Sequence, residues 1–164
     1  MNRLLKLRYS PEDGMLVKYE KVSGDDGPAE TITLESAERP RQALKDALKV
    51  MAEHLCTIAE LPSTWAEKIE IRGVTLTWTQ DIRGLVITGL RTLKGSNAPL
   101  VLNSPHSTES PYNEGEDDIG VYNGDCGEAL DELESQAMAY VSGDREQLQL
   151  SLTEEPSAVL HAAN

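Results

Sequence analysis

The chain has 164 residues, which is enough for one domain with a substantial hydrophobic core but not for two of typical size. Its net charge is −13, and no apolar stretch approaches the roughly 20 residues that a helix needs to span a bilayer. Few apolar residues precede Arg8, so we expect no secretory signal at the N-terminus.

The two cysteines, Cys56 and Cys126, are typical of a reduced cytoplasmic protein rather than of a disulfide framework. We therefore expect a cytoplasmic location, with a single disulfide between them as the alternative.

The negative charge lies in the last third of the chain. Residues 1–102 contain 14 acidic and 14 basic residues, whereas residues 103–164 contain the other 14 acids and one base, Arg145. Because DNA binding requires Lys and Arg to neutralise phosphates, we expect no DNA binding by this acidic third. Its charge suits either a solvated, solubilising face or an acidic surface that meets a basic partner.

The first residues predict a hairpin and a short strand. Apolar and polar side chains alternate over residues 3–9 and 15–20, and the turn-forming sequence SPEDG separates the two segments. Residues 31–34 predict a short third strand.

A long helix is predicted next. Ser36 is its expected N-cap, and Pro40 suits its first turn. Apolar residues then recur at helical spacing: Leu44, Ala47, Leu48, Met51, Leu55 and Ile58. This stripe must be buried, and we expect Leu48, Met51 and Leu55 to pack on Val74, Leu76 or Val86 of the sheet.

The segment 68–94 predicts one long hairpin, rich in β-branched residues. Folding it about Asp81 places Leu76 opposite Val86 and Gly73 opposite Gly89. The apolar alternation changes parity near Gly73, which is typical of a β-bulge. Two opposed glycines also suit a helix that packs across the sheet.

The fold class expected from these elements is α+β: a curved antiparallel sheet of about five strands, formed by two hairpins and a short strand. The long helix lies on one face, and a second helix follows at residues 124–142, with Glu128, Asp131 and Glu132 near its start and Gly143 after its end. We expect one domain over residues 1–143, with a long acidic loop at 103–122, and a flexible acidic tail over residues 144–164.

The long loop contains the residues that best suit a small ligand. These are Asn103, Ser104, His106, Asp117 and Asp118. A turn held by the Asn and Ser side chains explains Asn103 and Ser104 equally well. Carboxylates of the 103–125 segment suit calcium or magnesium, but their spacing is not that of an EF-hand. No catalytic motif surrounds the three histidines, so we expect no enzyme, no cofactor and no metal.

The tail contains a short motif formed by Gln149, Leu150, Ser151 and Leu152. It resembles the Gln-Leu-Ser/Asp-Leu-Phe peptides with which bacterial proteins dock on the DNA sliding clamp, although Thr153 stands at the position of the Phe. The resemblance implies a tail that binds a protein. The alternating Leu148, Leu150 and Leu152 also suit an edge strand.

The order of hairpin, helix, long hairpin, Leu/Glu-rich helix and QLSL-like end also resembles a group of small acidic proteins of tailed bacteriophages, to which no function is assigned. This resemblance implies an accessory protein in the bacterial host cytoplasm. It would act in DNA replication, recombination or host takeover by binding a bacterial or phage protein, with the sliding clamp as one expected partner. Two alternatives remain: an acidic inhibitor that mimics DNA or blocks a defence protein, and a small-ligand or metal-binding protein that uses the 103–125 loop.

Overall fold

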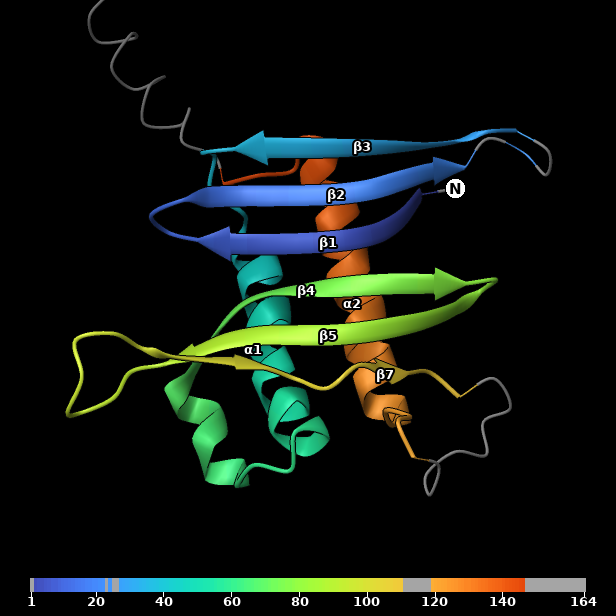
Figure 1. Ribbon diagram of the computed structural model, residues 1–164. Helices are drawn as coiled ribbons and strands as arrows, with labels where there is room; N and C mark the ends of the chain where they lie inside the picture. The colour runs from blue at the N-terminus through green and yellow to red at the C-terminus, as the bar shows by residue number, and fades with distance from the viewer. Residues whose placement is uncertain (1, 23, 25–26, 111–118, 147–164) are drawn as a thin grey trace, which may run out of the picture.

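The computed structural model describes residues 2–22, 24, 27–110 and 119–146, which form an α+β fold around one antiparallel sheet (Figure 1). Its strands are β1 (Asn2–Ser10), β2 (Gly14–Val22), β3 (Ala29–Ser36), β4 (Ile69–Thr79), β5 (Ile82–Arg91), β6 (Leu100–Asn103) and β7 (Ser107–Thr108). They lie in the order β3-β2-β1-β4-β5-β6, and β7 also pairs with β5. The predicted fold class is confirmed, with seven strands in place of about five.

Two helices, α1 (Gln42–Ile58) and α2 (Gly124–Val141), cover the same face of the sheet and leave the other face open (Figure 1). The 3-10 helix η1 (Ser63–Lys68) leads from α1 into β4. Neither described α-helix combines the length and apolar character needed to cross a bilayer.

The core forms between this helical layer and the inner face of the sheet. As predicted, Leu48, Met51 and Leu55 are buried, at 4%, 0% and 0% exposure. They belong to the same core cluster as Val74 and Leu76. Val86, the third predicted contact, pairs with Thr75 and is only partly buried, because its side chain lies on the open face.

Both helices form where the sequence predicts them, but the predicted N-cap of the first helix is wrong. Ser36 ends β3 and its Oγ accepts a hydrogen bond from the Glu38 N–H, so it stabilises a turn before the helix. Arg41 occupies the N-cap position of α1 without a side-chain cap. Asn123 caps α2 by accepting a hydrogen bond from the Cys126 N–H at 2.8 Å.

The long hairpin β4–β5 is confirmed, but the register predicted by folding about Asp81 is wrong by one residue. Leu76 pairs with Leu85 and Gly73 pairs with Thr88. The turn consists of Gln80 and Asp81 between the paired ends of the strands, with Gln80 at a φ of 59°. A register shift between Ile71 and Gly73 confirms the predicted bulge.

Gly73 and Gly89 of this hairpin are required for different structural reasons. A Cβ on Gly73 would lie 2.0 Å from the Leu7 carbonyl oxygen, so this glycine allows β1 to approach β4. A Cβ on Gly89 would lie 2.6 Å from Ile69 Cγ2 and 3.2 Å from Leu55 Cδ2. Gly89 therefore makes room for α1 to pack across the sheet.

Candidate functional site

Two of the predicted ligand residues, Asn103 and Ser104, hold the end of β6 against β5. Thr88 Oγ1 donates a hydrogen bond of 2.7 Å to Asn103 Oδ1. Ser104 is buried; its Oγ accepts from the Ile87 N–H at 2.8 Å, and its own N–H donates to the Ile87 carbonyl at 2.8 Å. These hydrogen bonds give both residues a structural role.

His106 lies across the β4–β5 pair. Its Nε2 is 2.9 Å from Thr77 Oγ1, and Thr77 pairs with Gly84. A Cβ on Gly84 would lie 2.2 Å from the same Nε2, so the imidazole occupies the space that this glycine leaves empty. The structure thus brings Asn103, Ser104 and His106 to the side of the sheet where β6 and β7 pair with β5.

The other predicted site residues lie outside the described part of the chain. These are Asp117 and Asp118 of the long loop, and Gln149, Leu150, Ser151 and Leu152 of the tail. The described part of that loop, expected over residues 103–122, contains β7 and a parallel bridge between Thr108 and Val121. Among the described residues, no group of three or more His, Cys, Asp or Glu side chains is arranged to hold a metal ion.

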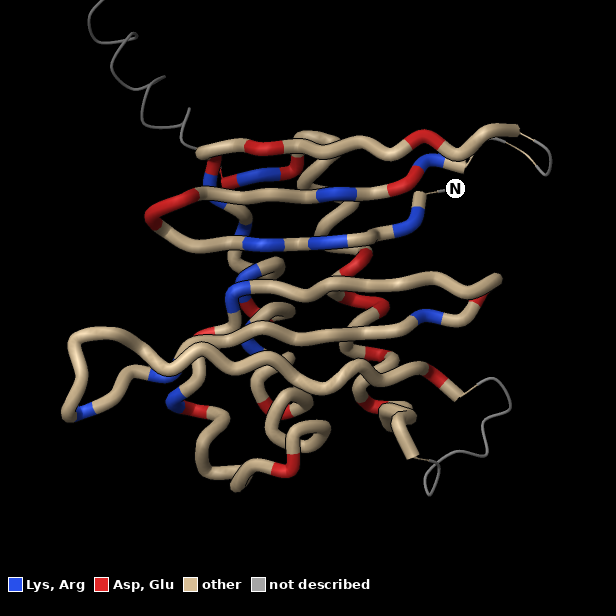
Figure 2. Tube along the Cα trace, in the orientation of Figure 1, with Lys and Arg blue, Asp and Glu red and all other residues tan. Residues whose placement is uncertain are grey.

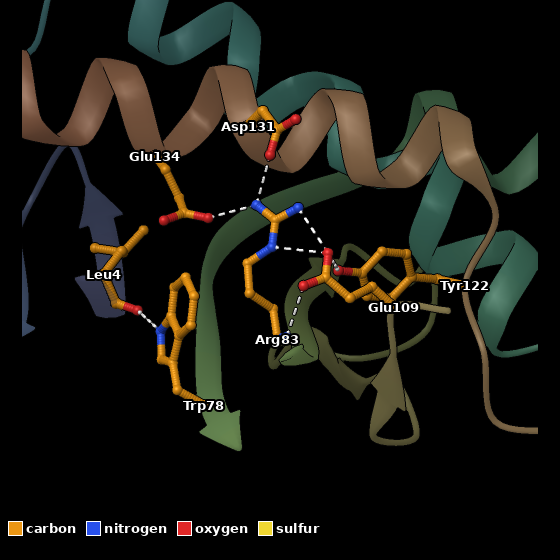
Figure 3. A network of polar contacts seen from close by, with 7 residues as sticks. All are labelled: Leu4, Trp78, Arg83, Glu109, Tyr122, Asp131 and Glu134. Carbon is orange, nitrogen blue, oxygen red and sulfur yellow. Dashed lines mark hydrogen bonds and ion pairs between the residues drawn. The ribbon is translucent and has the colours of Figure 1, made fainter. Parts of the chain in front are cut away.

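A network of ion pairs around Arg83 was not predicted from the sequence (Figure 3). The Arg83 side chain on β5 is 11% exposed and donates to Glu109 at 3.0 Å, Asp131 at 2.6 Å and Glu134 at 2.6 Å. Glu109 Oε1 also accepts the Arg83 backbone N–H at 2.9 Å. The Tyr122 hydroxyl lies 3.4 Å from Glu109 Oε2 and donates to it. The network therefore joins β5, the segment after β7 and α2.

Burial and charge together determine the protonation of this network. Burial lowers the pKa of Arg83, but hydrogen bonds with Glu134 and Glu109 raise it overall, so the guanidinium stays charged. Burial of the Glu134 carboxyl raises its pKa. The hydrogen bond and the positive charge of Arg83 lower this pKa, but by less, because Glu109 and Asp131 bind the same guanidinium. A guanidinium surrounded in this way is already neutralised, so it is not available to bind an anionic ligand.

A cavity of about 700 Å³ lies between the C-terminal end of α1 and the segment before α2. Its lining includes His54, His106, Tyr122 and Cys126. Burial lowers the pKa of His54, which favours the neutral imidazole, and burial raises the pKa of Cys126 to about 12. The Cys126 thiol therefore stays protonated at neutral pH and is a poor nucleophile.

Residues 144–146, which were expected to begin the flexible tail, are bound to the segment before α1. Pro40 and Arg145 form an antiparallel bridge, and the Glu146 N–H donates to the Arg39 carbonyl at 2.9 Å. Arg145 Nε donates to the Tyr140 carbonyl at 3.0 Å, and Arg145 pairs with Glu38 at 3.0 Å. We call this set of contacts, made by residues 144–146, the tail anchor.

Two further ion pairs complete the tail anchor. Arg41 pairs with Asp144, and Lys45 Nζ lies 3.8 Å from Glu146 Oε2. The chain is therefore fixed to the domain as far as Glu146. The motif that begins at Gln149 follows three positions later in the sequence.

The acidic residues of α2 and three basic residues of β1 and β2 lie in different layers of the fold. Five acidic residues and no basic residue lie on α2: Asp125, Glu128, Asp131, Glu132 and Glu134 (Figure 2). Lys6, Arg8 and Lys18 alternate with the buried Leu7 and Val17, so they point to the open face of the sheet.

Comparison of the chain with models of known protein families, with curated proteins and with solved structures finds no match.

Proposed function

We propose that this chain is a phage-type accessory protein without catalytic activity. In this proposal it binds another protein in DNA replication, recombination or host takeover, and residues 149–152 dock on the bacterial DNA sliding clamp. The observation that carries the proposal is the tail anchor. It fixes the chain at Glu146, so a partner held by the motif would also be held close to the folded domain.

The proposed contact depends on a few side chains. Leu150 and Leu152 would fill an apolar cleft, and the Gln149 amide would set the register by hydrogen bonding. Thr153 lacks the ring that supplies much of the binding energy in aromatic anchors. We therefore expect micromolar or weaker affinity, about −8 kcal/mol.

Two observations favour a binding protein over an enzyme, because they leave polar groups near the predicted ligand loop unsuited to catalysis. Asn103 and Ser104 are used to join β6 to β5, and the Cys126 thiol is held in its protonated form.

Calorimetric titration of the intact chain into purified bacterial sliding clamp tests the proposal. Replacing Leu150 and Leu152 together by Ala should abolish the heat of binding, whereas Leu148→Ala, one residue before the motif, should leave it unchanged. Thr153→Phe should strengthen binding by about tenfold or more, because it restores the aromatic anchor. Absence of binding by both the intact chain and Thr153→Phe would reject the clamp as the partner.

The acidic surface of α2 favours a second candidate function, an inhibitor that occupies a basic site on a DNA-binding protein. Asp131 and Glu134 are used by Arg83, which leaves Asp125, Glu128 and Glu132 for a partner. Capture of a DNA-binding protein from bacterial lysate should then be lost when these three residues are changed to Asn, Gln and Gln. Capture that persists in this triple variant would exclude α2 as the interface.

A further inference from the structure

A second cavity lies between α1, the end of β1 and the start of β4. It encloses about 380 Å³, within the range of about 300–1,000 Å³ that is usual for small-ligand sites. Its walls are largely apolar and include the buried Leu48, Ile69 and Ile71 together with the half-buried Tyr9. The cavity therefore has the apolar body of a ligand site.

The cavity opens where β1 and β4 separate. Their pairing covers Lys6, Leu7 and Arg8 of β1 and ends at Gly73 of β4. Tyr9 is the next residue of β1, and it lines the cavity. The opening thus follows from the end of the strand ladder and not from a missing side chain in the core.

Three lysines line this cavity: Lys45 and Lys49 from α1, and Lys68 from the end of η1. Lys45 is paired with Glu146 in the tail anchor. Within the described part of the chain, Lys49 and Lys68 have no ion pair. Lys45 and Lys49 are four residues apart on one helical face, where like charges repel.

Two carboxylates also line the cavity, and they only partly offset these lysines. Glu70 contacts Arg72, at 3.4 Å between Oε1 and Nη1. Glu67 is then the other lining carboxylate beside Lys49 and Lys68, which have no ion pair with a described residue. The local charge therefore favours an anion, in a chain whose net charge is −13.

We propose that this cavity binds a small amphiphilic anion, of the class of medium-chain carboxylates. The apolar chain would lie against Leu48, Ile69 and Ile71, and the carboxylate would be bound by Lys49 and Lys68. The residues proposed to bind the anion belong to α1, η1 and β4, so this site does not depend on the proposed clamp contact.

Calorimetry on the intact chain with octanoate as the probe tests the site, with octylammonium as a probe of the same length and opposite charge. Octanoate should bind saturably, with a dissociation constant of about 1 mM or below, and octylammonium about tenfold or more weakly. The double variant Lys49→Met/Lys68→Met keeps the side-chain stems and should weaken octanoate about tenfold or more, at an unchanged melting temperature. Lys18→Met, on the open face of the sheet, should bind octanoate as the unmodified chain does.

Three results would overturn the proposal. Equal affinity for octanoate and octylammonium would indicate apolar adsorption alone. An equal loss in Lys18→Met and in the double variant would indicate a general charge effect. Absence of saturable octanoate binding would show that the cavity does not accept this class of ligand.

Discussion

At the scale of single residues, Arg83 has the densest set of polar contacts in the described structure. One guanidinium from β5 connects Glu109, Asp131 and Glu134, whose sequence separations from it are 26, 48 and 51 residues. Alternation along β5 places Arg83 on the inner face, opposite Trp78. No local pattern specifies which carboxylates reach it, because they come from a loop and from α2.

Replacing Arg83 by Met should destabilise the fold by about 2–4 kcal/mol, because Glu109 and Glu134 would lose the cation that offsets their burial. This loss is smaller than that expected for a fully buried ion pair, since the side chains of Glu109 and Glu134 keep 26% and 17% exposure. Urea denaturation measures the loss. In the control Asp131→Asn, the carboxylate is 66% exposed, and we expect a loss of less than about 1 kcal/mol. Equal losses in the two variants would contradict a partly buried network.

Glu134 should make stability depend on pH. Its folded pKa is raised, mainly by burial, so the folded state binds the proton more readily than the unfolded state. Its stabilising contribution is therefore complete below the unfolded pKa of about 4.3 and is lost as the pH rises through the folded pKa. The unfolding free energy of the natural chain minus that of Glu134→Gln should accordingly decrease as the pH rises above about 4. A difference that is constant with pH would argue against this shift.

At the scale of elements, the sequence predicts what depends on spacing and residue type. Helical spacing locates the buried stripe of α1, and the parity change near Gly73 locates the bulge. The hairpin register was wrong because a two-residue turn at Gln80 and Asp81 carries no glycine or asparagine to identify it. The strand β7 has two residues, too few for an alternating pattern.

The packing of α1 on the sheet predicts that Leu48→Ala costs about 2–5 kcal/mol, because it removes buried methyl groups from the core. Val50→Ala on the same helix is the matched control, since Val50 is 46% exposed. Thermal and urea unfolding of both variants measure the difference. A Leu48→Ala loss as small as that of Val50→Ala would place α1 elsewhere.

The open face of the sheet contains a like-charge pair, Lys6 on β1 directly opposite Lys18 on β2. Lys6→Glu should therefore stabilise the chain by about 0.2–1 kcal/mol, because it replaces repulsion by attraction. Lys21→Glu is the opposite test, since Lys21 pairs with Glu30 of β3 and should lose stability. Melting temperatures that move in the same direction in both variants would contradict the strand register.

At the scale of the whole molecule, the acidic residues of α2 belong to the helical layer on one face of the sheet, and Lys6, Arg8 and Lys18 point to its other, open face. The charge asymmetry between the two parts of the sequence was evident from composition. The tail anchor was not, because residues 144–146 contain no apolar periodicity and bind by backbone hydrogen bonds and ion pairs to residues 38–45. Residues 144–146, which were expected to begin the tail, are therefore bound to the segment around the start of α1.

The most direct test of the proposed function compares two truncated chains, one ending at Glu146 and one ending at Gly143. For each, the melting temperature and the calorimetric affinity for the sliding clamp are measured beside the intact chain. The chain ending at Glu146 should keep the melting temperature and lose clamp binding, because it retains the tail anchor and lacks Gln149, Leu150 and Leu152. The chain ending at Gly143 should also melt at a lower temperature, since it loses the Arg145 contacts with Glu38 and Tyr140. Undiminished clamp binding by the chain that ends at Glu146, or a melting temperature reduced as far as in the shorter chain, would contradict a tail that serves as a binding element.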